Sequence, residues 1–63
     1  MTLKEAYEDA AKRGKGIIVN GVIGGRKNDP RLMAYIEQHA GRQVGLAGEA
    51  RGFVIVRLKP GRQ

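Results

Sequence analysis

The middle of this chain contains the stretch Lys15-Gly16-Ile17-Ile18-Val19-Asn20-Gly21-Val22-Ile23-Gly24-Gly25. Its β-branched residues are typical of strands. The Asn20-Gly21 pair stands between two apolar runs, and such a pair is a strong signal for a tight hairpin turn. We therefore expect a β-hairpin here, and the alternative is one continuous strand that bends at Gly21.

A helix is predicted before this hairpin, over about residues 3–13. Thr2 and Glu5 have the spacing of a capping box, in which each residue satisfies a backbone N–H group of the other. Apolar residues then recur at helical spacing, and Gly14 offers the left-handed conformation that ends many helices.

A second helix is predicted after the hairpin. Asp29 is a capping residue, and Pro30 follows at the first helical position, where its missing N–H group costs nothing. Gly41 should end this helix. Its buried stripe should consist of Leu32, Met33, Ile36 and Ala40.

The last third of the chain predicts a second hairpin. We expect a short strand over residues 43–47, a turn over residues 48–52 and a strand over residues 53–59. Residues 60–63 should form a flexible basic tail beyond a single compact domain that covers residues 1–59.

This order of elements, α-β-β-α-β-β, predicts an α+β fold with a small antiparallel β-sheet and both helices mostly on one face. A domain of 63 residues buries only about 60% of its unfolded surface, so its core is small. We therefore expect a homodimer, because association would bury more apolar surface.

The charge of the chain is its clearest functional signal. It has 12 Lys and Arg residues against 6 Asp and Glu residues, and from residue 12 onward eleven basic residues face three acidic ones. Such a field favours nucleic acid or an acidic protein surface as the partner. No apolar run approaches the length of a membrane span and no secretory signal is evident, so we expect no membrane contact and a cytoplasmic location.

The last predicted strand has two different faces, since successive side chains of a strand alternate. Val54, Val56 and Leu58 should face the core. On the other face, Phe53 could stack on a base, and the cations that follow it could contact phosphates. The alternative is that a helix covers this face and that the cations mark a solvated strand end.

The loop from Gly24 to Asn28 is a second candidate site. Its glycines and the helix that follows could present backbone N–H groups to a phosphate, beside the cations Arg26 and Lys27. Asp29 opposes this, because it should occupy the capping position, and the loop lacks the phosphate-loop pattern. The alternative is a solvated connection.

The sequence contains few of the residue types that commonly act in catalysis. It contains no Cys and no Ser, and its one Thr is the expected helix cap. His39 is the only histidine, and the carboxylates show no paired spacing, so we expect neither an enzyme nor a metal or cofactor site. The remaining catalytic hypothesis is metal-free RNA cleavage by His39 and Tyr35.

The leading hypothesis is therefore a small non-catalytic, regulatory protein that grips the phosphate backbone of nucleic acid. The alternative is an inhibitor, of the kind found in phages or mobile elements, that binds an acidic or nucleic-acid-binding surface of a larger enzyme. The residues expected to contact nucleic acid are Arg26, Lys27, Arg31, Arg42, Arg51, Phe53, Arg57 and Lys59.

Overall fold

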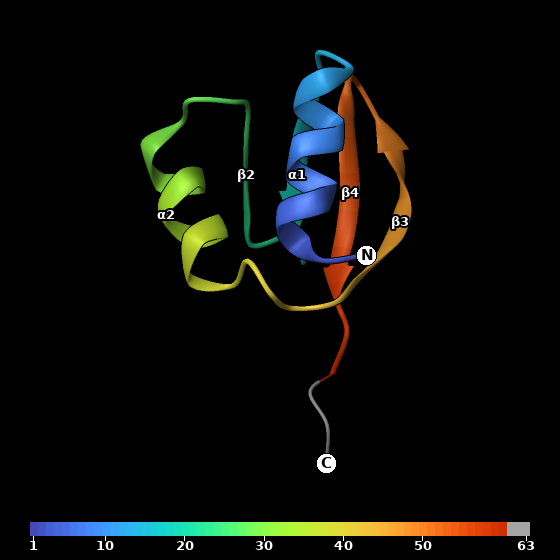
Figure 1. Ribbon diagram of the computed structural model, residues 1–63. Coiled ribbons are helices and arrows are strands. Elements are labelled where there is room, and N and C mark those ends of the chain that lie inside the picture. Colours follow the sequence, from blue (N-terminus) through green and yellow to red (C-terminus); the bar gives the residue numbers. More distant parts are fainter. Residues whose placement is uncertain (61–63) are drawn as a thin grey trace.

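The computed structural model describes residues 1–60, which form two helices and a four-stranded mixed sheet (Figure 1). The predicted α+β class and the predicted element order are confirmed. The elements are α1 (Leu3–Lys12), β1 (Gly16–Val19), β2 (Ile23–Gly25), α2 (Pro30–Gln38), β3 (Val44–Ala50) and β4 (Phe53–Leu58). Of the tail predicted for residues 60–63, all but Pro60 lies outside the described residues.

The sheet has the strand order β2-β1-β4-β3, and its central pair is parallel. The two outer pairs, β1 with β2 and β3 with β4, are the predicted antiparallel hairpins. The sequence predicted antiparallel pairing throughout, whereas β1 and β4 run in the same direction. The reason is that α2 connects the two hairpins. This long connection allows β4, at the far end of the chain, to pair with β1 in the parallel direction.

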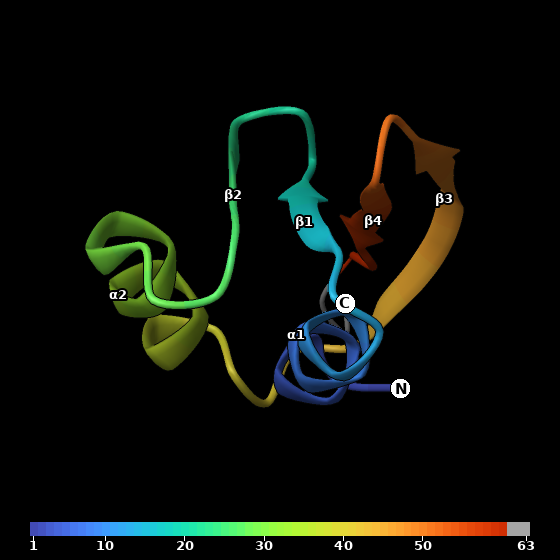
Figure 2. The same cartoon turned by 90° about the horizontal axis from the view of Figure 1, so that it is seen from above.

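Both helices lie on the same side of this sheet (Figure 2). Helix α1 packs on the central strands β1 and β4, and α2 packs on the edge strand β2 and on α1. The core between the helices and the sheet consists of Leu3, Ala6, Ala10, Ile17, Val19, Leu32, Ile36, Val44, Val54 and Val56. No helix of the described chain is long and apolar enough to cross a membrane. The homodimer stays a prediction.

The N-terminal ends of both helices form as the sequence indicates, whereas α2 ends at Gln38, before the Gly41 that was expected to end it. Thr2 and Glu5 make the reciprocal capping box of α1, with the Thr2 backbone N–H donating to Glu5 Oε1 over 2.8 Å. The Asp29 side chain accepts from the N–H groups of Arg31 and Leu32 at the start of α2.

The predicted buried stripe of α2 is wider than the observed one. Leu32 and Ile36 are buried, but Met33 is 44% exposed and Ala40 lies beyond the end of the helix, at Gln38. The cause is the position of α2 at the edge of the sheet (Figure 2), and its two buried residues, Leu32 and Ile36, lie one turn apart in a single row.

Both hairpin turns use two residues with positive φ. In the first, Asn20 and Gly21 have φ angles of 54° and 67°, which confirms the predicted hairpin over the alternative of a bent strand. The second turn is shorter than predicted, because β3 continues to Ala50 and only Arg51 and Gly52 make the turn. A bulge between Leu46 and Gly48 lets β3 stay paired with β4 over this extra length.

Asn20 also connects the first turn to the end of β4. Its backbone N–H donates to the Val56 carbonyl over 2.9 Å, and its Oδ1 accepts from the Leu58 N–H over 2.8 Å. These two bonds continue the parallel β1–β4 pair beyond Val19.

We predict that Asn20→Ala lowers the free energy of unfolding by about 1–2 kcal/mol, because alanine lacks the acceptor for Leu58 and disfavours positive φ. Asn20→Asp keeps an acceptor and tolerates this backbone conformation, so it should stay closer to the original protein. Denaturant unfolding measures both variants. Equal stability of the two variants would contradict the role given to this side chain.

Candidate functional site

The face of the sheet that points away from the helices carries a short apolar strip. Val54 and Val56 are buried in the core, so the alternating residues Phe53, Ile55 and Arg57 of β4 lie on the opposite face. The parallel register places Ile18 beside Ile55. We call this side of the sheet the open face, because both helices lie on the other side (Figure 2).

Small residues surround the strip on the neighbouring strands. Gly16 is the register partner of Phe53 on β1, and Gly24 is the partner of Ile18 on β2. On β3 the partners of Arg57, Ile55 and Phe53 are Gly45, Gly48 and Ala50. The open face therefore has low relief, with Ile18, Phe53 and Ile55 as its half-buried centre.

The Phe53 ring is held between two other groups. A Cβ atom on Gly16 would collide with the ring and would also lie 2.8 Å from the Gly25 carbonyl oxygen, so only glycine leaves this space open. On the ring, the guanidinium carbon of Arg26 lies 4.7 Å from the centroid, which is a cation–π contact. Arg26 thus reaches from the end of β2 to the start of β4.

The basic residues of the open face stand at its two ends. Arg26 lies at the Phe53 end, where Gly52 is close to its guanidinium, and Arg51 is in the turn just before Phe53. Arg57 and Lys59 lie at the other end, and the Lys59 side chain extends over Gly45. Lys59 is six positions after Phe53 along the extended chain, a span of about 20 Å.

Three of the sequence-predicted residues do not lie on the open face. Lys27 lines a hollow with residues of α1, on the helix side. Arg31 lines another hollow beside Tyr35, on the flank of α2 and β2. Arg42 lies at the end of the sheet, where its Nη2 donates to the Lys59 carbonyl over 2.9 Å. The structure therefore places Arg26, Phe53, Arg57 and Lys59 on the open face, with Arg51 in the turn before Phe53. Arg42 lies beside Lys59 at the end of the sheet, and Lys27 and Arg31 are separated from the open face.

Sequence reasoning missed the small residues of this face and the role of Ile18. The alternation of β1, with Ile17 and Val19 buried and Ile18 between them, carried the signal for Ile18. The contact of Gly16 with Phe53 had no local signal, because 37 positions separate the two residues in the sequence.

The acidic residues gather on the opposite side of the molecule. Glu5, Glu8 and Asp9 belong to α1, Asp29 caps α2, and Glu37 belongs to α2. Glu49 is on β3, but its carboxylate pairs with Lys15 and with Arg13 at the end of α1. The six carboxylates therefore leave the open face to the cations.

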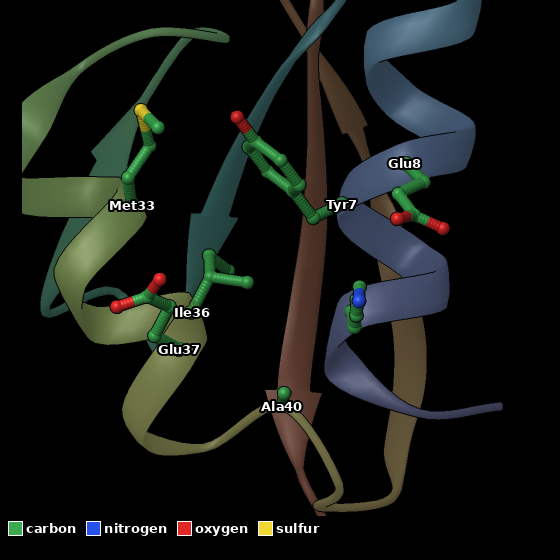
Figure 3. A pocket seen from close by; sticks show the side chains of 7 residues that line it. Tyr7, Glu8, Met33, Ile36, Glu37 and Ala40 are labelled. Carbon is green, nitrogen blue, oxygen red and sulfur yellow. The ribbon is translucent and has the colours of Figure 1, made fainter.

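A groove of about 270 Å³ lies between α1 and α2 (Figure 3). Tyr7, Met33 and Ile36 point into it, and Lys4, Glu8 and Glu37 line it as well. Two carboxylates against one ammonium group make this groove unfavourable for an anion.

His39 and Tyr35, the candidates for RNA cleavage, are neighbours at the end of α2. Their ring centroids are 4.5 Å apart, and the His39 backbone N–H donates to the carbonyls of Tyr35 and Ile36. Among residues 1–60, no three His, Asp or Glu side chains gather in a way that could hold a metal ion.

Comparison of this chain with protein-family models, with curated proteins and with solved structures finds no match.

We predict that Gly16→Ala lowers the free energy of unfolding by about 1–3 kcal/mol, because the added methyl group overlaps the Phe53 ring and the Gly25 carbonyl. Gly41→Ala is the matched control, since a Cβ atom there meets nothing within 4 Å. Thermal or denaturant unfolding compares them. If both substitutions have the same small effect, Phe53 does not rest on Gly16.

A second prediction concerns Glu49. The hydrogen bond from Lys15, the charge of Lys15 and then that of Arg13 hold the pKa of the Glu49 carboxyl below its ordinary value of 4.5. A pKa that is lower in the folded state contributes stability above pH 4.5, and this stability is lost as the pH falls through the folded pKa. An NMR titration of the carboxyl group should show a midpoint below 4.5 that rises in Lys15→Ala. A midpoint that does not change in this variant would overturn the pairing.

Proposed function

We propose that this protein is a non-catalytic nucleic-acid-binding protein that contacts the phosphate backbone with the open face of its sheet. The observation that carries the proposal is the distribution of carboxylates: the helix side holds both carboxylates and cations, among them Lys12 and Lys27, whereas the open face holds cations alone. The helix side holds the carboxylates, and the open face holds Arg26, Arg57 and Lys59 around an apolar strip.

This distribution matters because a polyanion is repelled by carboxylates as strongly as it is attracted by cations at the same distance. A formal net charge of +6 attracts it to the molecule from a distance. The location of the carboxylates then favours one orientation, with the open face toward the phosphates. Of the eight residues predicted from the sequence, we therefore retain Arg26, Arg51, Phe53, Arg57 and Lys59 as the contact set.

The same cations could pair with the carboxylates of a protein partner, as in the inhibitor hypothesis. Salt dependence separates the two hypotheses, because release of condensed counterions from nucleic acid makes its binding fall steeply as the salt concentration rises. The first experiment is fluorescence anisotropy with labelled single- and double-stranded DNA and RNA, titrated from low to physiological salt.

We predict that Arg57→Ala weakens binding several-fold and lowers the slope of log affinity against log salt by about 1, as loss of one phosphate contact requires. Arg31→Ala is the matched control, because it removes the same charge from the flank of α2 and should change affinity much less. Equal effects of the two variants would show that only net charge matters. Feeble binding of the original protein that vanishes by physiological salt would end the proposal in favour of an acidic protein partner.

A further inference from the structure

The arrangement of Arg26 on Phe53 points to a more specific ligand. We propose that the protein selects single-stranded nucleic acid, and that one unpaired base stacks on the Arg26 guanidinium, which lies over the Phe53 ring. This inference rests on the proposed function and adds the class of nucleic acid and the group that recognises a base.

The first step of the argument is the stack itself. The Phe53 ring lies against the backbone of Gly16, and the Arg26 guanidinium lies on the ring, 4.7 Å from its centroid. Arg26 is exposed while Phe53 is half-buried, so a ligand can reach the Arg26 side chain. A planar guanidinium held on an aromatic ring is one of the surfaces on which unstacked bases stack in proteins.

The second step is that the conformation of the Arg26 side chain is already restricted by its contact with Phe53. An arginine side chain that points freely into solvent loses much rotamer entropy when it binds. Arg26 already contacts the ring before any ligand is present, and its Nη2 lies near Gly52 in the next turn. Binding of a base therefore requires less additional ordering than it would at a free arginine.

The third step concerns the shape of the open face. Sequence is read in duplex DNA by a helix or a two-stranded ribbon that enters the major groove. The helices of this protein lie on the far side of the sheet, and glycines flank the strip on the open face (Figure 2). A low surface of this kind cannot reach a paired and stacked base, whereas a single strand can turn its bases onto it.

The positions of the other cations complete the site. Arg57 lies about 13 Å from Phe53 along β4, and Lys59 lies about 20 Å from it, just beyond the strand. A nucleic-acid strand that runs along the open face therefore places phosphates near these cations while a base lies on Arg26. Ile18 and Ile55 form the apolar floor between these ends.

The test compares a single-stranded oligonucleotide with an abasic oligomer of the same length and charge, and with a duplex. Stacking of one base should make the protein bind the base-containing strand about 5- to 100-fold more tightly than the abasic strand. Arg26→Lys keeps the positive charge but removes the planar guanidinium group. It should therefore bring this affinity ratio close to 1, with little change in the slope of log affinity against log salt. Arg31→Lys makes the same exchange on the flank of α2, away from the open face, so it is the matched control and should keep the ratio.

Phe53→Leu provides a second measurement, because it removes the ring under Arg26 while it keeps an apolar side chain. It should lower the same ratio, and circular dichroism verifies that the variant is folded. If the variant does not fold, Arg26→Lys alone decides, because that residue is exposed.

The outcomes distinguish this inference from the proposed function. If the protein binds abasic, single-stranded and duplex ligands equally well, and Arg26→Lys changes nothing, phosphate binding stands and base stacking is wrong. If it binds none of them at physiological salt, the proposed function falls and the inference falls with it.

Discussion

The parallel pairing of β1 with β4 is the constraint on which the rest of this structure depends. The two halves of the chain each form an antiparallel hairpin, and a two-stranded hairpin alone is marginally stable in water. The β1–β4 pair joins them into one sheet. Its register places Ile17 beside Val54 and Val19 beside Val56, and these four side chains are the centre of the core under α1.

The same register builds the open face. Because side chains alternate, pairing Ile17 with Val54 also brings Gly16 under Phe53 and Ile18 beside Ile55. A slip of one residue would exchange the two faces and place apolar core residues in water. The interactions that keep the core together therefore also position the stack of Arg26 on Phe53. Asn20 stabilises this register from the end of the pair through its bonds to the backbone of β4.

The edges of the sheet are less suited to a contact surface than its open face. Strand β2 has three residues, and the start of β3 is covered by the N-terminal segment, where the Val44 N–H donates to the Met1 carbonyl over 2.9 Å. The bulge in β3 interrupts the remaining edge, as in many proteins that avoid edge-to-edge pairing. The charges at this edge also favour the open face as the contact surface. Glu49 lies at the edge, on the helix side, where it forms ion pairs with Arg13 and Lys15.

Local signals in the sequence were sufficient for the elements of this fold. The capping box of Thr2 and Glu5, the cap at Asp29 and the Asn20-Gly21 turn act within a few residues, so their outcomes did not depend on distant parts of the chain. The alternation of β4 likewise predicted the core side of Val54 and Val56. The overall charge and the candidate cations were also evident from composition and pattern alone.

Three features could be determined only from the folded chain. They are the parallel direction of the β1–β4 pair, the narrow buried stripe of α2 and the separation of Lys27 and Arg31 from the open face. Each depends on packing between segments that are far apart in sequence, and residue spacing carries no information about such contacts. The stack of Gly16, Phe53 and Arg26 is the clearest case, because three strands contribute to it or end beside it. Composition supplied the cations, and long-range strand pairing determined which of them share a surface with an aromatic ring.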